Sequence, residues 1–143
     1  MAAERAGWQP RAASRPDRSG KIWACKFTVV HDCGLIINPD GLRRRIEGNV
    51  VQGTSRALSE EVTFDRAKVA STDCSPTRSS TSPRRRRRST SVLINRPELP
   101  PAGAGESSIR PVAAALANAV FDATGVRLRR APFTPARLRP LLA

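Results

Sequence analysis

Residues 31–59 decide the fold of this chain, and they read HDCGLIINPDGLRRRIEGNVVQGTSRALS. Asn38 can accept hydrogen bonds from the free N–H groups at a helix start, and Pro39 suits the first helical position. After it, apolar or small residues recur every four positions, which predicts one buried stripe on a helix that runs to about Ser59. The stripe consists of Leu42, Ile46, Val50, Thr54 and Leu58, with Val51 and Ala57 beside them.

Two glycines lie within this expected helix. Gly48 and Gly53 each lower its intrinsic stability by about 1 kcal/mol relative to Ala. Such glycines in a buried helix indicate that another backbone or a ligand comes close. Asp32 and Asn38, by contrast, suit turn and cap positions better than ligand positions.

The flanking segments predict short strands. Residues 21–31 alternate with both faces mostly apolar, which is typical of a strand covered on two sides. The turn before them needs Gly20 at its positive-φ position. Residues 60–71 predict a hairpin, and residues 92–94 predict a short apolar strand.

The C-terminal third predicts a second main helix over residues 108–124. Ser108 can cap its start after a Pro- and Gly-rich loop, and Gly125 ends it. A short basic helix follows at residues 135–141. The buried stripe of the second main helix would be Val112, Leu116, Ala119, Val120 and Ala123. The whole pattern predicts an α+β fold in which short mixed strands pack on two main helices.

The chain divides into four parts. Residues 1–19 are an irregular lead-in, and residues 20–73 and 92–143 are the two parts of one domain. Residues 74–91, rich in Ser and Arg, cannot bury enough apolar area to offset the entropy cost of ordering, so we expect disorder there. No stretch approaches the roughly 20 apolar residues of a membrane span, so we expect no membrane partner. The subcellular location is not readable.

The formal net charge of +13 first suggests a nucleic acid partner. However, residues 74–92 hold six of the 25 basic residues and none of the 12 acidic ones. No aromatic residues alternate with the arginines at 84–88, as base stacking would require. We therefore expect only nonspecific contact with nucleic acid. A basic nucleic-acid-binding protein that uses residues 84–88 and 43–45 is kept as an alternative hypothesis.

The three cysteines form no CxxC pair and are odd in number. They therefore predict neither a disulfide framework nor a strong metal signature. His31 lies between Cys25 and Cys33, but a zinc site at these spacings would be unusual. We interpret Cys25, His31 and Cys33 as ordinary strand residues and not as ligands.

Two sequence blocks carry a resemblance to a known family. The first is HDCGLIINPDG at 31–41, which continues into IEG and VQG by residue 53. The second is PPAGAGE at 100–106, followed by ANAVFDATG at 117–125. In this order and spacing they resemble the C-terminal part of the molybdopterin-binding large subunit of molybdenum hydroxylases. That family includes xanthine dehydrogenase, aldehyde oxidoreductase and isoquinoline 1-oxidoreductase.

The resemblance implies a molybdenum–pterin cofactor and a role for four residues. In this family the metal carries a dithiolene pterin, a sulfido and a hydroxyl ligand. A glutamate in a Gly-x-Gly-Glu loop deprotonates that hydroxyl, whose oxygen attacks an electron-poor carbon while hydride passes to the sulfido group. Only Glu106 matches this glutamate, which makes it the candidate general base. Gly103 and Gly105 would keep the loop backbone close to the cofactor, and Gln52 would face the pterin; no residue here is assigned to the metal.

Each assignment has a plainer alternative. Glu106 also suits a carboxylate that interacts with the dipole at a helix N-terminus. Gly103 and Gly105 are also ordinary turn residues, and Gln52 also fits an exposed helix position.

The resemblance also implies partners. The substrate would be a small aldehyde or N-heterocycle, and electrons would leave through iron–sulfur clusters, with or without FAD, on other domains or subunits. The family's dithiolene contacts and substrate pocket draw heavily on parts that have no counterpart here. We therefore expect an incomplete cofactor-binding domain that is inactive alone and pairs with the remainder of the large subunit. A non-functional remnant is the other alternative.

One segment departs from the family pattern. At residues 74–91 the family would have a Tyr-Pro pair, alternating aliphatic residues and a Glu- and Pro-rich stretch, instead of Ser, Thr and Arg. A shifted reading frame would explain the difference, with Val92 back in frame. The coding DNA tests this hypothesis, because a nearby single-base change must then restore the family pattern.

Overall fold

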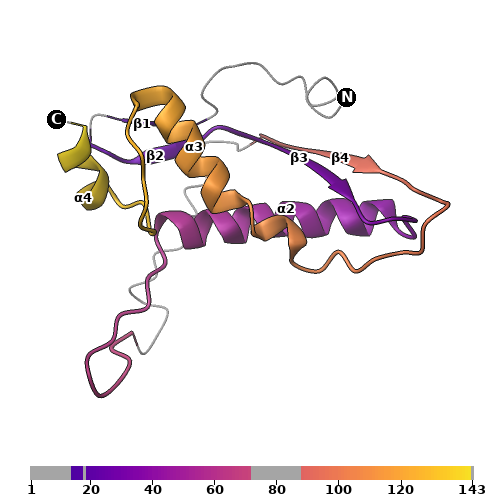
Figure 1. Cartoon of the computed structure of the whole chain (residues 1–143), viewed down its shortest axis with the longest axis horizontal. Helices are drawn as coiled ribbons and strands as arrows, with labels where there is room; N and C mark the ends of the chain where they lie inside the picture. Colours follow the sequence, from indigo (N-terminus) through magenta and orange to yellow (C-terminus); the bar gives the residue numbers. More distant parts are fainter. Residues whose placement is uncertain (1–13, 18, 72–87, 143) are drawn as a thin grey trace.

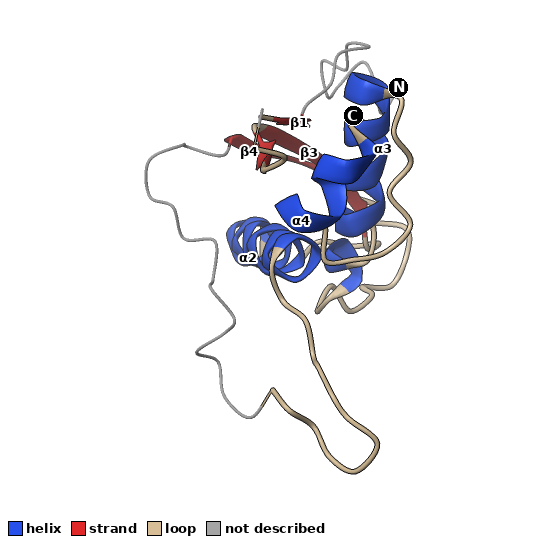
Figure 2. Cartoon of the chain, turned by 90° about the vertical axis from the view of Figure 1, so that its left-hand side faces the viewer, coloured by secondary structure: helices blue, strands red, loops and turns tan. Residues whose placement is uncertain are grey.

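The computed structural model describes residues 14–17, 19–71 and 88–142. The long helix α2 forms the base, and the paired strands β3 and β4 lie on the same side of it as the helix α3 (Figures 1 and 2). In chain order the elements are β1 (Ser14–Pro16), β2 (Ile22–Ala24), β3 (Lys26–Asp32), α2 (Pro39–Leu58), β4 (Arg88–Ile94), the 3₁₀ turn η1 (Ser107–Ile109), α3 (Val112–Thr124), α4 (Pro135–Leu138) and the 3₁₀ turn η2 (Arg139–Leu141). The predicted α+β arrangement of short mixed strands on two main helices is confirmed.

The strands form two small sheets within the described residues. β1 and β2 are antiparallel, whereas β3 and β4 are parallel, in register from Lys26↔Arg88 to Asp32↔Ile94. The single strand predicted at residues 21–31 was therefore wrong, because the chain changes sheets at Cys25. Lys26, Thr28 and Asp32 are exposed, so β3 is covered on one face only.

β4 begins earlier than the sequence predicted. Its first residue is Arg88, and residues 88–91 pair with β3, so the expected disorder was wrong for these four positions. Backbone pairing with β3 orders them although their side chains are mostly hydroxyls. The remainder of that expected disordered segment lies outside the described residues, because it falls within residues 72–87.

The first main helix matches its prediction. Asn38 caps α2, since its Oδ1 accepts a hydrogen bond from Gly41 N at 2.8 Å. The predicted stripe is buried or half-buried, but Val51 beside it is exposed. A Cβ atom built on Gly53 would lie 2.9 Å from Val112 Cβ, so the close neighbour at this glycine is a side chain of α3 and not a backbone. Nothing described lies within 4 Å of the corresponding position on Gly48.

The second main helix starts later than predicted. The 3₁₀ turn η1 occupies the first expected turn, Pro111 takes the N-cap position of α3, and Gly125 ends α3 with a φ of +73°. Val112, Leu116 and Val120 are buried, whereas Ala123 is exposed and was wrongly placed in the stripe. None of the helices within the described ranges has the length and apolar character that crossing a bilayer requires.

The hydrophobic core lies between the C-terminal half of α2, α3 and the last segment of the chain. Phe133 N donates a hydrogen bond to Ala57 O at 2.7 Å, which ties this last segment to α2. The buried members of the core are Ile22, Ala57, Val112, Leu116, Val120, Leu128, Phe133 and Leu138. The core therefore holds both parts of the predicted domain together.

Two hydroxyls within the β3–β4 pair are buried without a hydrogen-bond partner among the described atoms. They are the Oγ atoms of Ser89 and Ser91, and the Nε2 of His31 is in the same state. Ser89 lies opposite Phe27 and Ser91 opposite Val29, so both serines occupy a sheet face where apolar residues are typical. A buried hydroxyl without a partner costs about 1–3 kcal/mol.

We predict that removing these hydroxyls stabilises the chain. The double variant Ser89→Ala and Ser91→Ala should raise the free energy of unfolding by about 1 kcal/mol or more, because no hydroxyl is then desolvated without a partner. The urea midpoint monitored by circular dichroism measures this. Thr90→Ala, on the exposed face, is the control, and an unchanged midpoint in the double variant would contradict the prediction.

The turn between β1 and β2 is organised by Asp17. Its carboxylate accepts hydrogen bonds from Ser19 Oγ, Trp23 Nε1 and the backbone N–H groups of Ser19 and Lys21, at 2.5 to 3.1 Å. These bonds, with the Ser19 hydroxyl first, lower the pKa of Asp17 from 3.8 to about 2. The predicted positive φ of Gly20 in this turn is confirmed at +80°.

We predict a pH-dependent contribution from this turn. Because the folded-state pKa of Asp17 lies below its unfolded value, its stabilising effect is present above pH of about 4 and is lost as the pH falls toward 2. Asp17→Asn should therefore be less stable than the wild-type chain at neutral pH and equal to it near pH 2. Urea midpoints measured across this pH range test the prediction. Ser19→Ala removes a hydrogen bond that lowers the pKa of Asp17, so the pH range over which the stability changes should be narrower in that variant.

Candidate functional site

The loop after β4 lies against the turn after β3. Ala102 N donates to Cys33 O at 2.8 Å, and Arg96 N donates to Gly34 O at 3.0 Å. Gly34 has a φ of +76°, and a Cβ atom built on it would lie 2.2 Å from Pro100 O. Only glycine fits this contact, so the loop that leads to Glu106 is held tightly at its beginning.

An ion-pair cluster supports the same loop. Arg96 pairs with Glu98 at 2.5 Å and with Asp32 at 3.4 Å, and its pKa is raised mainly by the hydrogen bond to Glu98. The same bond lowers the pKa of Glu98. Asp32 Oδ1 also accepts a hydrogen bond from Gly34 N, which confirms Asp32 as a turn residue.

A buried amide on α2 holds the far end of the loop. Asn49 is only 4% exposed, and its Nδ2 donates to Gly105 O and to Ser108 Oγ, each at 2.9 Å. Gly105 directly precedes Glu106, and Ser108 follows it by two residues. Asn49 therefore binds a backbone oxygen directly before the candidate base and a side-chain hydroxyl two residues after it.

Glu106 itself lies at the start of η1. Its carbonyl accepts a hydrogen bond from Ile109 N at 3.1 Å, and its side chain makes no capping hydrogen bond. The side chain is exposed, so the described residues do not enclose it in a pocket. A carboxylate on a fixed backbone with a free side chain can bind or release a proton, but it needs other walls to exclude water.

Gly103 and Gly105 are not required by the chain's own structure. Neither has a positive φ, and nothing described lies within 4 Å of a Cβ built on either residue. Turn geometry and internal packing therefore do not account for them. Both glycines are exposed, with open space beside the backbone at each of them.

Gln52 lies apart from this loop. It is exposed in an open groove of about 850 Å³ along α2. The groove is lined by Gly41, Arg44, Arg45, Gly48, Asn49, Val51, Gln52, Ser55 and Glu60. Gly103, Gly105 and Glu106 do not line it, so among the described residues Asn49 is the link between the groove and the loop.

The metal-site alternative finds no support within the described part of the chain. No group of three or more His, Cys, Asp or Glu side chains gathers there in a way that could hold a metal ion. Cys25 is exposed and Cys33 is half-buried.

Sequence reasoning missed Asn49. Its signal is position: Asn49 comes three residues after Ile46 and one before Val50, so it falls on the buried side of the helix. A buried amide requires hydrogen-bond partners. The polar residue beside the apolar stripe therefore indicated a polar contact, but not which loop supplies it.

Comparison with known proteins bears on both sequence blocks. Residues 17–75 match the model of the molybdopterin cofactor-binding domain. A nicotinate dehydrogenase subunit of Pseudomonas putida KT2440 is 42% identical over 87% of the chain. The putative xanthine dehydrogenase molybdenum-binding subunit XdhA of Escherichia coli K12 is 36% identical over 85%.

A solved structure shows the same fold. Quinoline 2-oxidoreductase from Pseudomonas putida 86 superposes on 85% of this chain with a TM-score of 0.72 and 25% identity. The matched part is 16% of that protein's chain, and it is 10% of the nicotinate dehydrogenase subunit and 18% of XdhA. This chain thus spans less than a fifth of the relatives it matches.

We predict that Asn49→Ala loosens the loop locally. Gly105 O and Ser108 Oγ lose their shared donor, so amide hydrogen exchange at residues 105–109 should accelerate about tenfold, while the centre of α3 is little changed. Hydrogen exchange with mass spectrometry measures this. Asn118→Ala, at an exposed position on α3, is the matched control. Equal exchange at residues 105–109 in the two variants would contradict the prediction.

Proposed function

Because this chain belongs to the molybdenum hydroxylase family, we propose that it supplies one wall of a molybdenum–pterin site in an oxidoreductase, with Glu106 as the general base. The observation that carries the proposal is the double hydrogen bond of Asn49, which fixes the loop on both sides of Glu106. A catalytic base must be held by its surroundings to act on a bound group. An ordinary surface glutamate needs no such support.

Two separate parts of the chain would hold the cofactor. The open space beside Gly103 and Gly105 lets a group approach the loop backbone, and Gln52 offers an amide in the groove on α2. When bound, the cofactor supplies the redox chemistry of hydroxylation. Glu106 accepts a proton at its carboxylate, and Asn49 holds the backbone that carries it.

The exposure of Glu106 supports the inactivity of the chain alone. An active site of this kind excludes water, which strengthens electrostatic interactions and prevents side reactions. Here the groove on α2 is open and the carboxylate is exposed. We propose that the remaining walls come from the rest of the molybdopterin-binding subunit, and that iron–sulfur or flavin subunits receive the electrons.

The names of the relatives include both substrate classes, with N-heterocycles the more frequent. Nicotinate, xanthine and quinoline are N-heterocycles, whereas another relative is named as an aldehyde dehydrogenase. We therefore propose an electron-poor carbon of an N-heterocycle as the site of hydroxylation, ahead of an aldehyde.

The positions of the arginines add little support to the alternative of a nucleic-acid-binding protein. Arg43 is engaged, since its Nη1 donates to Ser91 O at 2.8 Å, and Arg44 and Arg45 line the groove on α2. Residues 84–87 lie outside the described part of the chain. Nonspecific contact with phosphates is the most that these charges support.

The test is cofactor content. The chain should be expressed with the cofactor-insertion machinery, both alone and as a chimera that replaces the matching segment of the Pseudomonas putida nicotinate dehydrogenase subunit. We expect molybdenum and pterin in the purified chimera, and neither in the isolated chain. Absence of molybdenum and pterin from the chimera would overturn the proposal and favour the remnant hypothesis. Stoichiometric molybdenum in the isolated chain would contradict the claim that the chain is inactive by itself.

We predict that Glu106→Gln separates cofactor binding from catalysis. The amide cannot accept the proton, so kcat of the chimera should fall about 100-fold or more while its molybdenum content stays unchanged. Glu47→Gln, an exposed carboxylate on α2, is the control and should leave both values unchanged. Full activity of the Glu106 variant would refute its role as the base.

A further inference from the structure

The segment after α2 forms an arm that projects from the body. Residues 60–71 leave the end of α2 and turn back at a distance from the sheets and from α3, as both ribbon views show (Figures 1 and 2). Phe64 and Val69 form an antiparallel bridge, and Asp65 N donates to Lys68 O at 3.0 Å across the turn. The hairpin predicted from the sequence is thus present, but with one bridge in place of regular strands.

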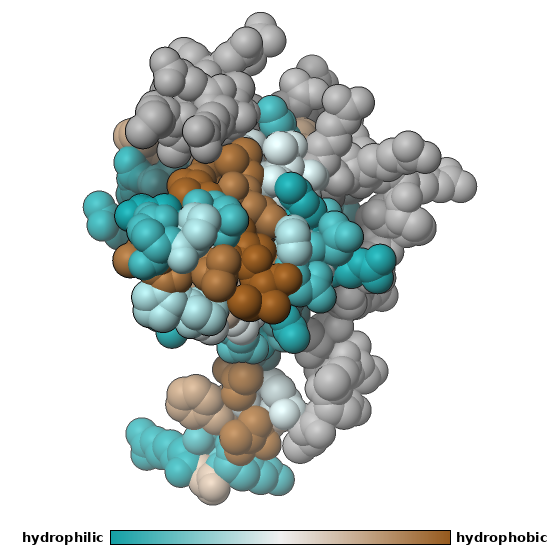
Figure 3. Space-filling model, turned by 90° about the vertical axis from the view of Figure 1, so that its right-hand side faces the viewer, coloured by the Kyte–Doolittle hydropathy of each residue, from teal (hydrophilic) through white to brown (hydrophobic). Residues whose placement is uncertain are grey.

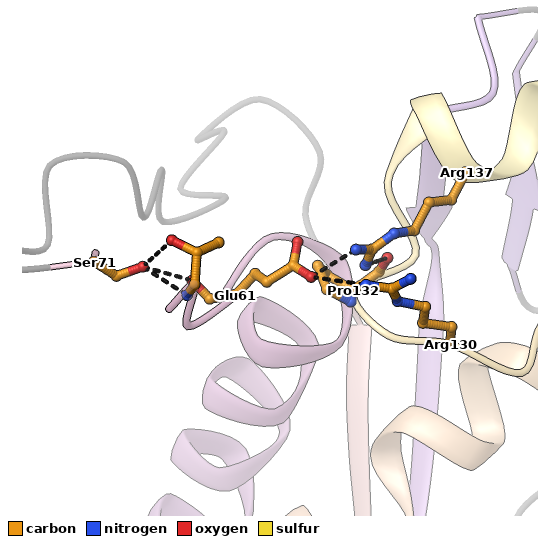
Figure 4. Close-up of polar contacts among 6 residues, drawn as sticks. Glu61, Ser71, Arg130, Pro132 and Arg137 are labelled. Atoms are coloured by element: carbon orange, nitrogen blue, oxygen red, sulfur yellow. Dashed lines mark hydrogen bonds and ion pairs between the residues drawn. The ribbon is translucent and has the colours of Figure 1, made fainter. Parts of the chain in front are cut away.

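The base of the arm is tied to the C-terminal segment. Arg137 Nη2 donates to Glu61 Oε1 at 2.6 Å, and Arg130 Nη2 lies 3.8 Å from the same oxygen (Figure 4). Arg137 Nη1 also donates to Pro132 O at 3.0 Å. These contacts tie the start of the arm to the C-terminal segment.

The arm has one polar face and one apolar face. Thr63 O accepts from both Ala70 N and Ser71 N, and the hydroxyls of Thr63 and Ser71 lie 2.9 Å apart. Phe64 and Val69, which lie directly opposite each other, share the other face. Val62, two residues before Phe64, is a third exposed apolar side chain of the arm.

The apolar face is uncovered. The exposed fractions are 67% for Val62, 75% for Phe64 and 51% for Val69. Figure 3 shows hydrophobic surface on the projecting arm, separate from the hydrophobic surface of the body. A two-stranded ribbon is marginal in water unless an apolar face packs against something. Exposed apolar surface with a charged rim is typical of an interface, and the turn here carries Asp65, Arg66 and Lys68.

We propose that the apolar face of this arm docks on the remainder of the molybdopterin-binding subunit, through an apolar surface on a part of the relatives that this chain does not match. The proposal rests on the function proposed above. The length of the relatives supports this occupant: the chain matches only 10% of the nicotinate dehydrogenase subunit and 16% of the quinoline 2-oxidoreductase chain. An arm with a fixed base and a free apolar face suits contact with such a neighbouring part.

The first test uses binding. The probe is the nicotinate dehydrogenase subunit expressed without its matching segment, and the full 143-residue chain is titrated into it. The wild-type chain should bind, and the double variant Phe64→Ser and Val69→Ser should bind about tenfold more weakly. Thr63→Ala with Ser71→Ala, on the polar face, is the matched control and should change the affinity less than about twofold. Equal affinities of the two double variants, or no binding by a probe that circular dichroism shows to be folded, would overturn the proposal.

The second test does not depend on the folding of the shortened subunit. In the chimera, where the whole subunit surrounds the chain, amide exchange at residues 62–70 should be about tenfold slower than in the isolated chain. Exchange that is equally fast in both would overturn the proposal. Protection in the isolated chain that rises with its concentration would assign the surface to a second copy and also overturn it. Neither readout requires molybdenum. A chimera whose arm is protected but which holds no cofactor would therefore contradict the proposed function and support the docking of the arm.

Discussion

The close approach of α2 to the start of α3 is the contact on which the rest of the structure depends. Gly53 leaves room for Val112 and Ile109, and a Cβ at that position would lie within about 3 Å of both side chains. This contact joins segments that are more than fifty residues apart. Because η1 precedes α3 directly, the same contact brings the loop that contains Glu106 to the surface of α2, where Asn49 binds it.

The functional interpretation follows from that placement. The loop that leads to Glu106 is held at Pro100 by a contact with Gly34 that only glycine allows, and at Gly105 by the buried amide of Asn49. Between these two points Gly103 remains exposed, and so does Glu106 just beyond them. A rigid backbone with exposed functional groups is what a binding wall needs. A complete active site would also need groups that close over it.

Three features of this chain are unfavourable in an isolated domain. Parallel strands are normally buried within larger sheets, yet within the described residues β3 and β4 form a sheet of two. Ser89 and Ser91 leave hydroxyls without partners inside it, and the arm at residues 60–71 exposes its apolar face. Each feature costs free energy in an isolated chain. Each is consistent with a part that belongs to the larger subunits to which it is related.

The sequence alone determined the local elements and the family, because these depend on neighbouring residues. The four-residue spacing, the Asn38-Pro39 start and Gly125 predicted the two main helices, and the two motif blocks indicated the molybdenum hydroxylases. It also singled out Glu106, whose role stays a prediction. Tertiary structure alone decided that the predicted strand divides at Cys25 and that β4 extends back to Arg88, because backbone pairing between distant segments outweighs local composition. Tertiary structure alone also placed Asn49 against Gly105. The sequence shows that a polar residue on the buried side of a helix needs a hydrogen-bond partner, but it does not show which distant backbone atom supplies it.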